Sequence, residues 1–278
     1  MHIFKSNDKV IVKYLDQLYS STAWTWDGFI NREGLHGKVL QDILNLPIRP
    51  ELSTDVEHPG APIGGQEIWA SGVTYLRSMD ARMEEAKNAG GGDFYSRVYS
   101  AERPEIFFKS PSYRAVGTQG TVRIRKDSKW NVPEPELVLF ICSIGTIEGY
   151  MIGNDMSSRD IEGENPLYLP QAKSYNGAAA VGPCLYVPAE PISSDTKIQI
   201  EILRGGVQIF ADEVLISRMK RTHQELANYL FMEISFPVGA YLMTGTGIVP
   251  PDSFTLKYRD VVNISISNIG TLSNIVGE

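Results

Sequence analysis

Alternation of apolar and polar residues predicts that most of this chain forms β-strands. The clearest example is residues 137–152, where two short runs of β-branched and aromatic side chains flank a glycine-containing connection at residues 144–146. Such runs favour strands, and so short a connection predicts a β-hairpin. Two more alternating hairpins are predicted, one over residues 197–214 with a Gly-Gly turn and one over residues 261–276.

Helical periodicity is limited to short segments. Residues 35–46 and 221–232 have the apolar spacing of brief helices, and residues 77–87 predict a charged helix with a thin apolar stripe. A triglycine run follows at residues 90–92, which suits either a mobile lid over a binding site or an ordinary flexible loop. Many strands and few helices, without a βαβ rhythm, predict an α+β, predominantly β fold.

The first part of the chain differs in character from the rest. It has two short predicted strands and one helix, followed by a region rich in proline and glycine at residues 47–65. We therefore predict a small N-terminal α+β domain at residues 1–62 and a larger catalytic domain at residues 63–278. Trp24 and Trp26 are better explained by core packing than by contact with a ligand.

Composition narrows the class of protein. With 42% hydrophobic residues the chain can form a proper core, and its net charge of −7, from 33 acidic and 26 basic residues, leaves no basic stripe. This balance argues against binding to nucleic acid or to an anionic membrane. Without a membrane-length apolar segment or a signal pattern, we expect a cytoplasmic protein. The two cysteines lack metal or redox spacing, and the four histidines are scattered, so neither type predicts a site.

Charged residues are concentrated between residues 153 and 177. Two prolines interrupt this stretch and remove backbone donors, so it is not built as a solvated surface helix. Its charged residues are Asp155, Arg159, Asp160, Glu162, Glu164 and Lys173.

The predicted hairpin relates Asp155 to two upstream carboxylates, Glu134 and Glu136. A two-residue loop places Asp155 opposite one or the other, and all three then share one face of the sheet. An odd loop would send Asp155 to the other face unless a bulge compensates. Three clustered carboxylates repel one another unless a cation neutralises them, and oxygen ligands suit Mg²⁺, Mn²⁺ or Ca²⁺. By spacing alone, a solvated strand end with unrelated acids is an equal alternative.

Four ordered motifs extend this picture: PEPEL, GNDMSSRD, ENPLYLPQAKSY and MTGTGIVP. Together they resemble the fumarylacetoacetate hydrolase superfamily over about residues 60–275, and within it the 2-keto-3-deoxypentonate dehydratases. The resemblance implies a mixed β-sandwich roll. It also implies that Glu134, Glu136 and Asp155 hold the divalent metal and that Lys173 lies beside the substrate.

The same resemblance implies further site residues. It places five side chains at or near the substrate: Tyr75, Arg77, Lys109, Arg159 and Thr246. Thr246 would hold the substrate carboxylate, and Lys109 stands where hydrolases of the family carry an arginine. Ser100 stands where those hydrolases carry a water-activating histidine, which argues against hydrolysis. Asp93 is more simply a surface residue than a further metal ligand.

The resemblance implies a lyase reaction. A 2-keto-3-deoxy-D-pentonate would lose water through a metal-stabilised enolate to give 2,5-dioxopentanoate. Lys173 would take the C3 proton, and Glu105 or Glu162 would protonate the leaving hydroxyl. The alternatives are an acylpyruvate or fumarylpyruvate hydrolase, an oxaloacetate decarboxylase, or a metal-dependent binding protein. Family members pair through this domain, so a homodimer or dimer of dimers is expected.

Overall fold

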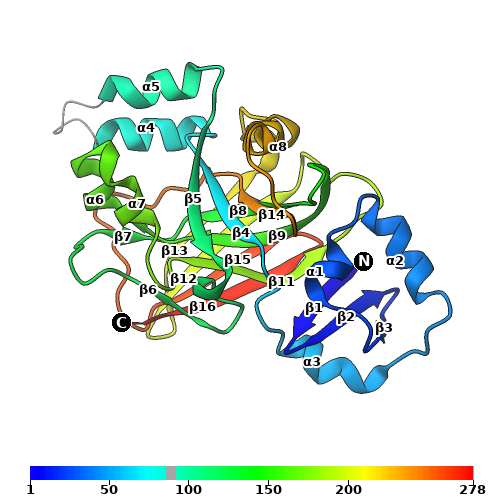
Figure 1. The fold of residues 1–278 in the computed structure, drawn as a ribbon. Coiled ribbons are helices and arrows are strands. Elements are labelled where there is room, and N and C mark those ends of the chain that lie inside the picture. Colours follow the sequence, from blue (N-terminus) through cyan, green and yellow to red (C-terminus); the bar gives the residue numbers. More distant parts are fainter. Residues whose placement is uncertain (86–91, 278) are drawn as a thin grey trace.

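A computed structural model describes residues 1–85 and 92–277, and strands dominate them (Figure 1). The strands of the described residues are β1 (His2–Ser6), β2 (Lys9–Tyr14), β3 (Gln17–Ser20), β4 (Glu67–Gly72), β5 (Glu105–Pro111), β6 (Thr121–Arg123), β7 (Asn131–Val132), β8 (Pro135–Ile141), β9 (Ile147–Asp155), β10 (Ser157–Ser158), β11 (Ala179–Tyr186), β12 (Lys197–Arg204), β13 (Val207–Leu215), β14 (Ala240–Met243), β15 (Val261–Ile266) and β16 (Gly270–Gly277). The α-helices there are α1 (Trp26–Ile30), α2 (Leu35–Ile43), α3 (Ser53–Glu57), α4 (Leu76–Glu85), α5 (Gly92–Ser100), α6 (Arg159–Glu164), α7 (Leu169–Lys173) and α8 (His223–Phe231).

Two large mixed sheets organise the described residues. A nine-stranded sheet has the order β3-β2-β1-β11-β9-β8-β14-β4-β5, and a five-stranded sheet has the order β13-β12-β15-β16-β6. Neighbouring strands are antiparallel except for the pairs β14 with β4 and β16 with β6. The remaining pair, β10 with β7, is a short ladder of its own. The predicted α+β, predominantly β class is confirmed.

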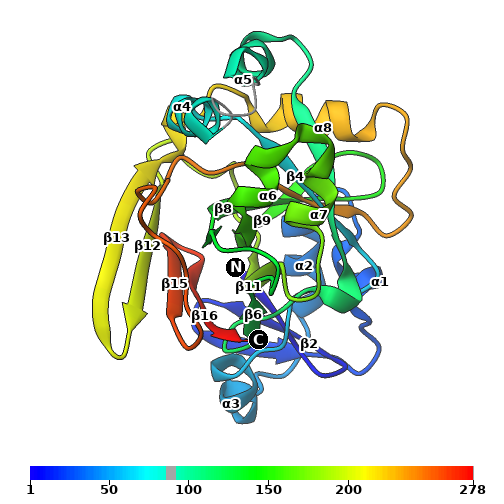
Figure 2. The same ribbon diagram turned by 90° about the vertical axis from the view of Figure 1, so that its left-hand side faces the viewer.

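The main apolar core lies between the two sheets. In β12, Ile198, Ile200 and Ile202 are buried and alternate with more exposed residues, as expected for a strand with one face on a core. They belong to the same cluster as Leu139 and Ile152 of the large sheet. Figure 2 shows β12, β13, β15 and β16 on one side of β8 and β9, with α6 and α7 on the other. The large sheet therefore has an inner apolar face and an outer face covered by helices.

The N-terminal segment extends the large sheet. Strand β1 pairs antiparallel with β11, and β2 and β3 continue outward to the edge. Trp26 is buried, and Phe29 and Val39 pack in the same cluster as Met151 and Leu185 of the outer sheet face. The predicted strands and helix of this segment are present, while its separation as a domain of residues 1–62 stays a prediction.

The β8–β9 hairpin has the predicted register, but it combines an odd-length turn with a β-bulge. Its turn is odd, because the Cys142 N–H donates to the Thr146 carbonyl at 2.9 Å, which leaves three residues in the loop. The register then shifts between Phe140 and Ile141, where β9 holds one extra residue. This bulge restores the alternation, so that Glu136 pairs with Gly153 further along the ladder.

The other hairpins follow the sequence prediction. Strands β12 and β13 are joined by Gly205 and Gly206, with φ of +59° and +81°, the two positive angles that a type I′ turn requires. Strands β15 and β16 form the C-terminal hairpin. Helix α4 begins near residue 77 as predicted, whereas part of the triglycine run, Gly90 and Gly91, lies outside the described residues.

Helices α4 and α5 pack together at one end of the molecule (Figures 1 and 2). Within residues 1–85 and 92–277, no helix combines the length and apolarity needed to cross a membrane. Cys142 and Cys184 are buried free thiols.

Candidate metal centre and active site

Three carboxylates meet at the end of the β8–β9 ladder. The backbones of Glu134 and Asp155 exchange hydrogen bonds of 3.2 and 2.9 Å, so these residues lie directly opposite each other. Glu136 is two residues further along and shares their face, because the side-chain period of a strand is two. One oxygen from each of the three carboxylates lies within 4.8 Å of the other two, and all three side chains are buried.

Lys173 lies directly against this triad. It is the last residue of α7, a five-residue helix with Pro170 near its start, and its side chain is fully buried. The Lys173 Nζ is 2.8 Å from Glu134 Oε2 and 3.2 Å from Asp155 Oδ2. Glu162 Oε1, from α6, is 3.9 Å away. The proline-interrupted stretch that follows β9 thus covers the triad with two short helices that supply a cation and a fourth carboxylate.

Two more cations support the triad. Lys109 of β5 is fully buried, and its Nζ is 2.5 Å from Asp155 Oδ1. It also donates to the backbone carbonyls of Met156, at 2.9 Å, and of Lys173. Arg159, at the start of α6, pairs with Glu134 Oε1 at 2.8 Å. The structure therefore brings both predicted cations to the triad, with Lys109 held by oxygens of the protein itself.

Burial and crowding shape the electrostatics. Burial raises the pKa of the Glu136 carboxyl well above its ordinary value, and the charges of Asp155 and Glu134 raise it further. Lys173 and a backbone N–H oppose that rise. Burial lowers the pKa of the Lys109 ammonium, and the charge of Asp155 works against that shift. Burial therefore favours the neutral forms of Glu136 and Lys109, and a nearby charge of opposite sign favours their charged forms.

The donor set fits a hard divalent cation. Three carboxylates in a buried cluster offer oxygen ligands, which suit Mg²⁺, Mn²⁺ or Ca²⁺ rather than softer metals. With Glu162, the cluster has four carboxylates against three cations, a formal net charge of −1. A divalent ion and one substrate carboxylate would together bring that sum to zero.

The predicted loop after β14 approaches the triad through its backbone. Gly245 has φ of +91°, and a Cβ there would lie 2.1 Å from Thr74 Oγ1, so only glycine fits. This lets the Gly245 N–H donate to Glu136 Oε2 at 2.6 Å. The buried Thr246 hydroxyl accepts from the Ile248 N–H at 3.1 Å, within its own loop. The predicted contact of Thr246 with a substrate carboxylate stays a prediction.

Tyr75 and Arg77, both predicted at or near the substrate, lie in different surroundings. Tyr75 is buried, which raises the pKa of its phenol, and the charge of Glu136 adds to that rise. Arg77 is half exposed, pairs with Asp212 of β13 at 2.7 Å and donates to the Val249 carbonyl at 3.1 Å. Tyr75 is therefore close to the triad, whereas Arg77 connects α4 to the five-stranded sheet.

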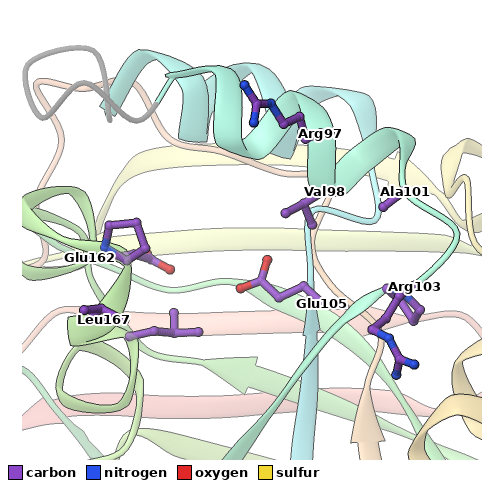
Figure 3. Close-up of a pocket in the computed structure, with 10 residues that line it drawn as sticks. Arg97, Val98, Ala101, Arg103, Glu105, Glu162 and Leu167 are labelled. Atoms are coloured by element: carbon purple, nitrogen blue, oxygen red, sulfur yellow. The ribbon is translucent and has the colours of Figure 1, made fainter.

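A pocket of about 520 Å³ opens beside this cluster, between α5, the start of β5 and the segment after α6. Glu105 and Glu162 both line it, and Figure 3 shows Glu105 in the middle of the pocket, with Glu162 and Leu167 to one side, Arg103 to the other and Val98 and Ala101 above. Glu162 thus contacts both the pocket and Lys173. Ser100 ends α5 and is exposed, while the side chain of Asp93 lies outside the described part of the structure.

Sequence reasoning missed one polar contact in the cluster. Ser157 Oγ lies 2.5 Å from Lys173 Nζ, and Ser157 is fully buried. It is two residues after Asp155 in an extended segment, so the same period-two argument that grouped the carboxylates could have placed it on their face.

Comparison with known proteins identifies the family. The family model described as Fumarylacetoacetate (FAA) hydrolase C-terminal matches residues 68–277. The chain therefore belongs to the fumarylacetoacetate hydrolase family, which confirms the resemblance seen in its motifs.

Individual relatives have names that are more specific than that of the family. The chain is 44% identical over 220 residues to "Probable 2-keto-3-deoxyxylonate dehydratase" of Haloferax volcanii, across 79% of this chain and 75% of that protein. It is also 44% identical over 215 residues to 2-dehydro-3-deoxy-D-arabinonate dehydratase of Saccharolobus solfataricus, across 76% and 72% of the two chains. A solved 2-keto-3-deoxy-D-arabinonate dehydratase, complexed with magnesium and 2,5-dioxopentanoate, superposes with a TM-score of 0.85 at 31% identity, covering 100% and 99% of the two chains.

Proposed function

We propose that this protein is a Mg²⁺-dependent dehydratase that converts 2-keto-3-deoxy-D-pentonate to 2,5-dioxopentanoate and water. The observation that carries the proposal is the buried set of three carboxylates with Lys173 against it and two pocket carboxylates beyond. Two relatives at 44% identity bear dehydratase names for this class of sugar acid, and the solved neighbour was described with magnesium and 2,5-dioxopentanoate.

The ion and the residues that hold it supply the first part of the chemistry. Glu134, Glu136 and Asp155 would hold Mg²⁺, which supplies a Lewis acid for the carboxylate and keto oxygens of the substrate. Lys173 is the base beside this set and takes a proton from C3. Lys109 and Arg159 pair with Asp155 and Glu134, so cations lie directly against both carboxylates in the buried site.

The pocket residues complete the reaction. Loss of water requires a proton at the C4 hydroxyl, and Glu105 or Glu162 donates it, because both line the pocket next to Lys173. The C3–H and C4–O bonds break, and the product of this step is an unsaturated alcohol. A proton shift from C5 to C3 then gives the enol at C5, and transfer of the enol hydroxyl proton to C4 yields 2,5-dioxopentanoate.

Substrate orientation is assigned to residues around this centre. Thr246 binds the substrate carboxylate. Arg159, Lys109 and Tyr75 border the triad, and Arg77 acts from α4. These roles rest on the family resemblance. Alanine or methionine variants of each, scored by KM, would test them one at a time.

The proposal is tested by mass spectrometry of the products from a panel of 2-keto acids, with and without Mg²⁺. We expect water loss from the D form of 2-keto-3-deoxypentonate, which D-arabinonate and D-xylonate both yield because they share the configuration at C4. The L form should react much more slowly, because the leaving hydroxyl must meet a fixed acid. Faster cleavage of fumarylpyruvate than dehydration of either sugar acid would replace the dehydratase by a hydrolase.

Assembly and location are also part of the proposal. We propose a homodimer or dimer of dimers, since family members pair through this domain, and light scattering of the purified protein would measure the mass. A cytoplasmic location stays a prediction from the sequence.

A further inference from the structure

We infer that Ser157 is a positioning residue that orients the Lys173 amino group for proton transfer at C3. Its Oγ lies 2.5 Å from Lys173 Nζ and 3.1 Å from the backbone carbonyl of Asp155, and the side chain is fully buried. The inference rests on the proposed role of Lys173 as the base and adds a residue that the family motifs did not assign.

The direction of the hydrogen bonds gives Ser157 this role. A serine hydroxyl has a single proton, and here that proton is donated to the Asp155 carbonyl. The oxygen therefore presents lone pairs to Lys173 and can only accept from it. One N–H of Lys173 is thus directed at Ser157.

The hydrogen bond to Ser157 restricts the direction in which the Lys173 lone pair can point. A neutral amine has two N–H groups and one lone pair, and the contact with Ser157 uses one N–H. The lone pair must then point in one of the other directions, which face Glu134 and Asp155 of the triad and Glu162 of the pocket. A substrate lying between the triad and the pocket would meet the amine from these directions. Ser157 is neutral and is not one of the three grouped carboxylates, so this contact does not compete with the binding of an ion.

The neighbouring serine provides a matched control. Ser158 is equally buried, but its Oγ donates to Asn131 Oδ1 at 3.0 Å instead of contacting Lys173. The two serines form the short strand β10, where successive side chains point in opposite directions. Ser157→Ala and Ser158→Ala therefore remove the same atom from adjacent buried positions, and only the first removes a partner of Lys173.

The experiment separates proton transfer from dehydration. The Mg²⁺-loaded protein is incubated in D₂O with 2-oxobutanoate, which lacks a C4 hydroxyl and cannot lose water, and exchange at C3 is followed by NMR. The C3 proton passes to Lys173 Nζ, and a deuteron from solvent returns to C3. In parallel, kcat and KM for 2-keto-3-deoxy-D-pentonate are measured, together with Mg²⁺ affinity by calorimetry and thermal unfolding.

We expect Ser157→Ala to lower both the exchange rate and kcat by about 10- to 100-fold, the scale expected for a misplaced catalytic group. KM and the Kd for Mg²⁺ should stay within about threefold, since neither measures the direction of the Lys173 amine. Ser157→Thr restores the hydroxyl and should recover most of the exchange rate. Ser158→Ala should exchange at close to the wild-type rate.

Other results would overturn the inference. Exchange by Ser157→Ala within about threefold of wild type would remove the role, and a parallel loss of Mg²⁺ affinity would make Ser157 a structural support of the triad. A wild-type protein that exchanges C3 protons but does not dehydrate the sugar acid would refute the proposed function while leaving the Ser157 comparison valid. A wild-type protein without exchange would refute the role of Ser157.

Discussion

Both faces of the nine-stranded sheet are buried, but the inner face carries the apolar core between the sheets and the outer face carries a charged cluster at one end. On the inner face, apolar side chains such as Leu139 and Ile152 pack against the five-stranded sheet, and each such burial contributes about 1.5–3 kcal/mol to stability. On the outer face, at the end of β8 and β9, the buried side chains are charged. Removing one ion from water costs several kcal/mol, which only close partners recover.

The same strands supply both faces residue by residue. In β8, Glu136 belongs to the triad, while the next residue, Leu137, belongs to the inner core. Stability and chemistry are therefore separated by side-chain direction rather than by distance along the chain. Variants on the inner face should therefore change stability and leave chemistry intact, and variants in the charged cluster at the end of the outer face should chiefly change chemistry.

Replacing the base should give the largest effect. Lys173→Met removes the amine but keeps the length of the side chain, so we expect kcat for dehydration to fall by about 10²- to 10⁴-fold. The Mg²⁺-loaded protein should remain folded, because the inner core is untouched and the ion compensates the carboxylates that Lys173 contacted. Steady-state kinetics measure the effect, and Lys197→Met, at a half-exposed ion pair on β12, is the control. A rate above about a tenth of wild type would exclude Lys173 as the principal base.

A core variant tests the other half of the comparison. Leu139→Ala leaves a cavity between the sheets and should lower the free energy of unfolding by about 2–5 kcal/mol. Mg²⁺ affinity and kcat, measured well below the melting temperature, should stay near wild type. Urea unfolding gives the stability, and the exposed Leu15→Ala should change it by less than about 0.5 kcal/mol. Loss of Mg²⁺ affinity in Leu139→Ala would show that the two faces are coupled.

Period-two alternation explains why much of this arrangement could be predicted from sequence. It grouped Glu134, Glu136 and Asp155 correctly, although the turn proved to be odd and a bulge at Phe140 restored the register. Loop length and bulge compensate each other, and only their combined effect on the side-chain face can be inferred from the apolar pattern. The sheet face of the three carboxylates could therefore be predicted more reliably than the length of the loop.

Contacts between distant segments could not be predicted in the same way. Lys109 reaches Asp155 because β5 lies at the edge of the sheet beneath α7, and no local pattern encodes that approach. Arg77 pairs with Asp212, which is 135 residues away in the chain. Family resemblance indicated that both cations are near the site, but it could not show which oxygens hold them.

The next effect concerns the metal ligands. Glu136→Gln keeps an oxygen for the Gly245 N–H but removes one charge from the triad, so Mg²⁺ affinity should fall by at least about 100-fold. The metal-free protein should be no less stable than wild type, because the mutual repulsion that raises the pKa of Glu136 is gone. Calorimetry and unfolding in chelator measure the two effects, with Glu213→Gln on the surface as control. Unchanged affinity would remove Glu136 from the ligand set.

The smallest expected effect is a difference in pH dependence between the two faces. His223, at the start of α8, is largely buried beside Tyr150, and burial lowers the pKa of its imidazole from 6.5 to about 4. The unfolded chain binds this proton more readily, so the stability contributed by neutral His223 is lost as pH falls from about 6.5 towards 4. The raised pKa of Glu136 acts in the opposite sense. In metal-free protein the folded state holds that proton, so stability falls as pH rises above 4.5, the ordinary pKa of the group.

Denaturant unfolding in chelator between pH 4.5 and 7 separates these two contributions. His223→Gln cannot gain a charge, and its stability relative to wild type should improve by on the order of 1–2 kcal/mol as the pH falls through that range. Glu136→Gln should show the reverse trend, with its advantage over wild type growing as the pH rises. Added Mg²⁺ should abolish the Glu136 trend, because ion binding favours the charged carboxylate, and should leave the His223 trend unchanged. Parallel trends in the two variants would mean that the inner and outer faces do not respond independently to protons.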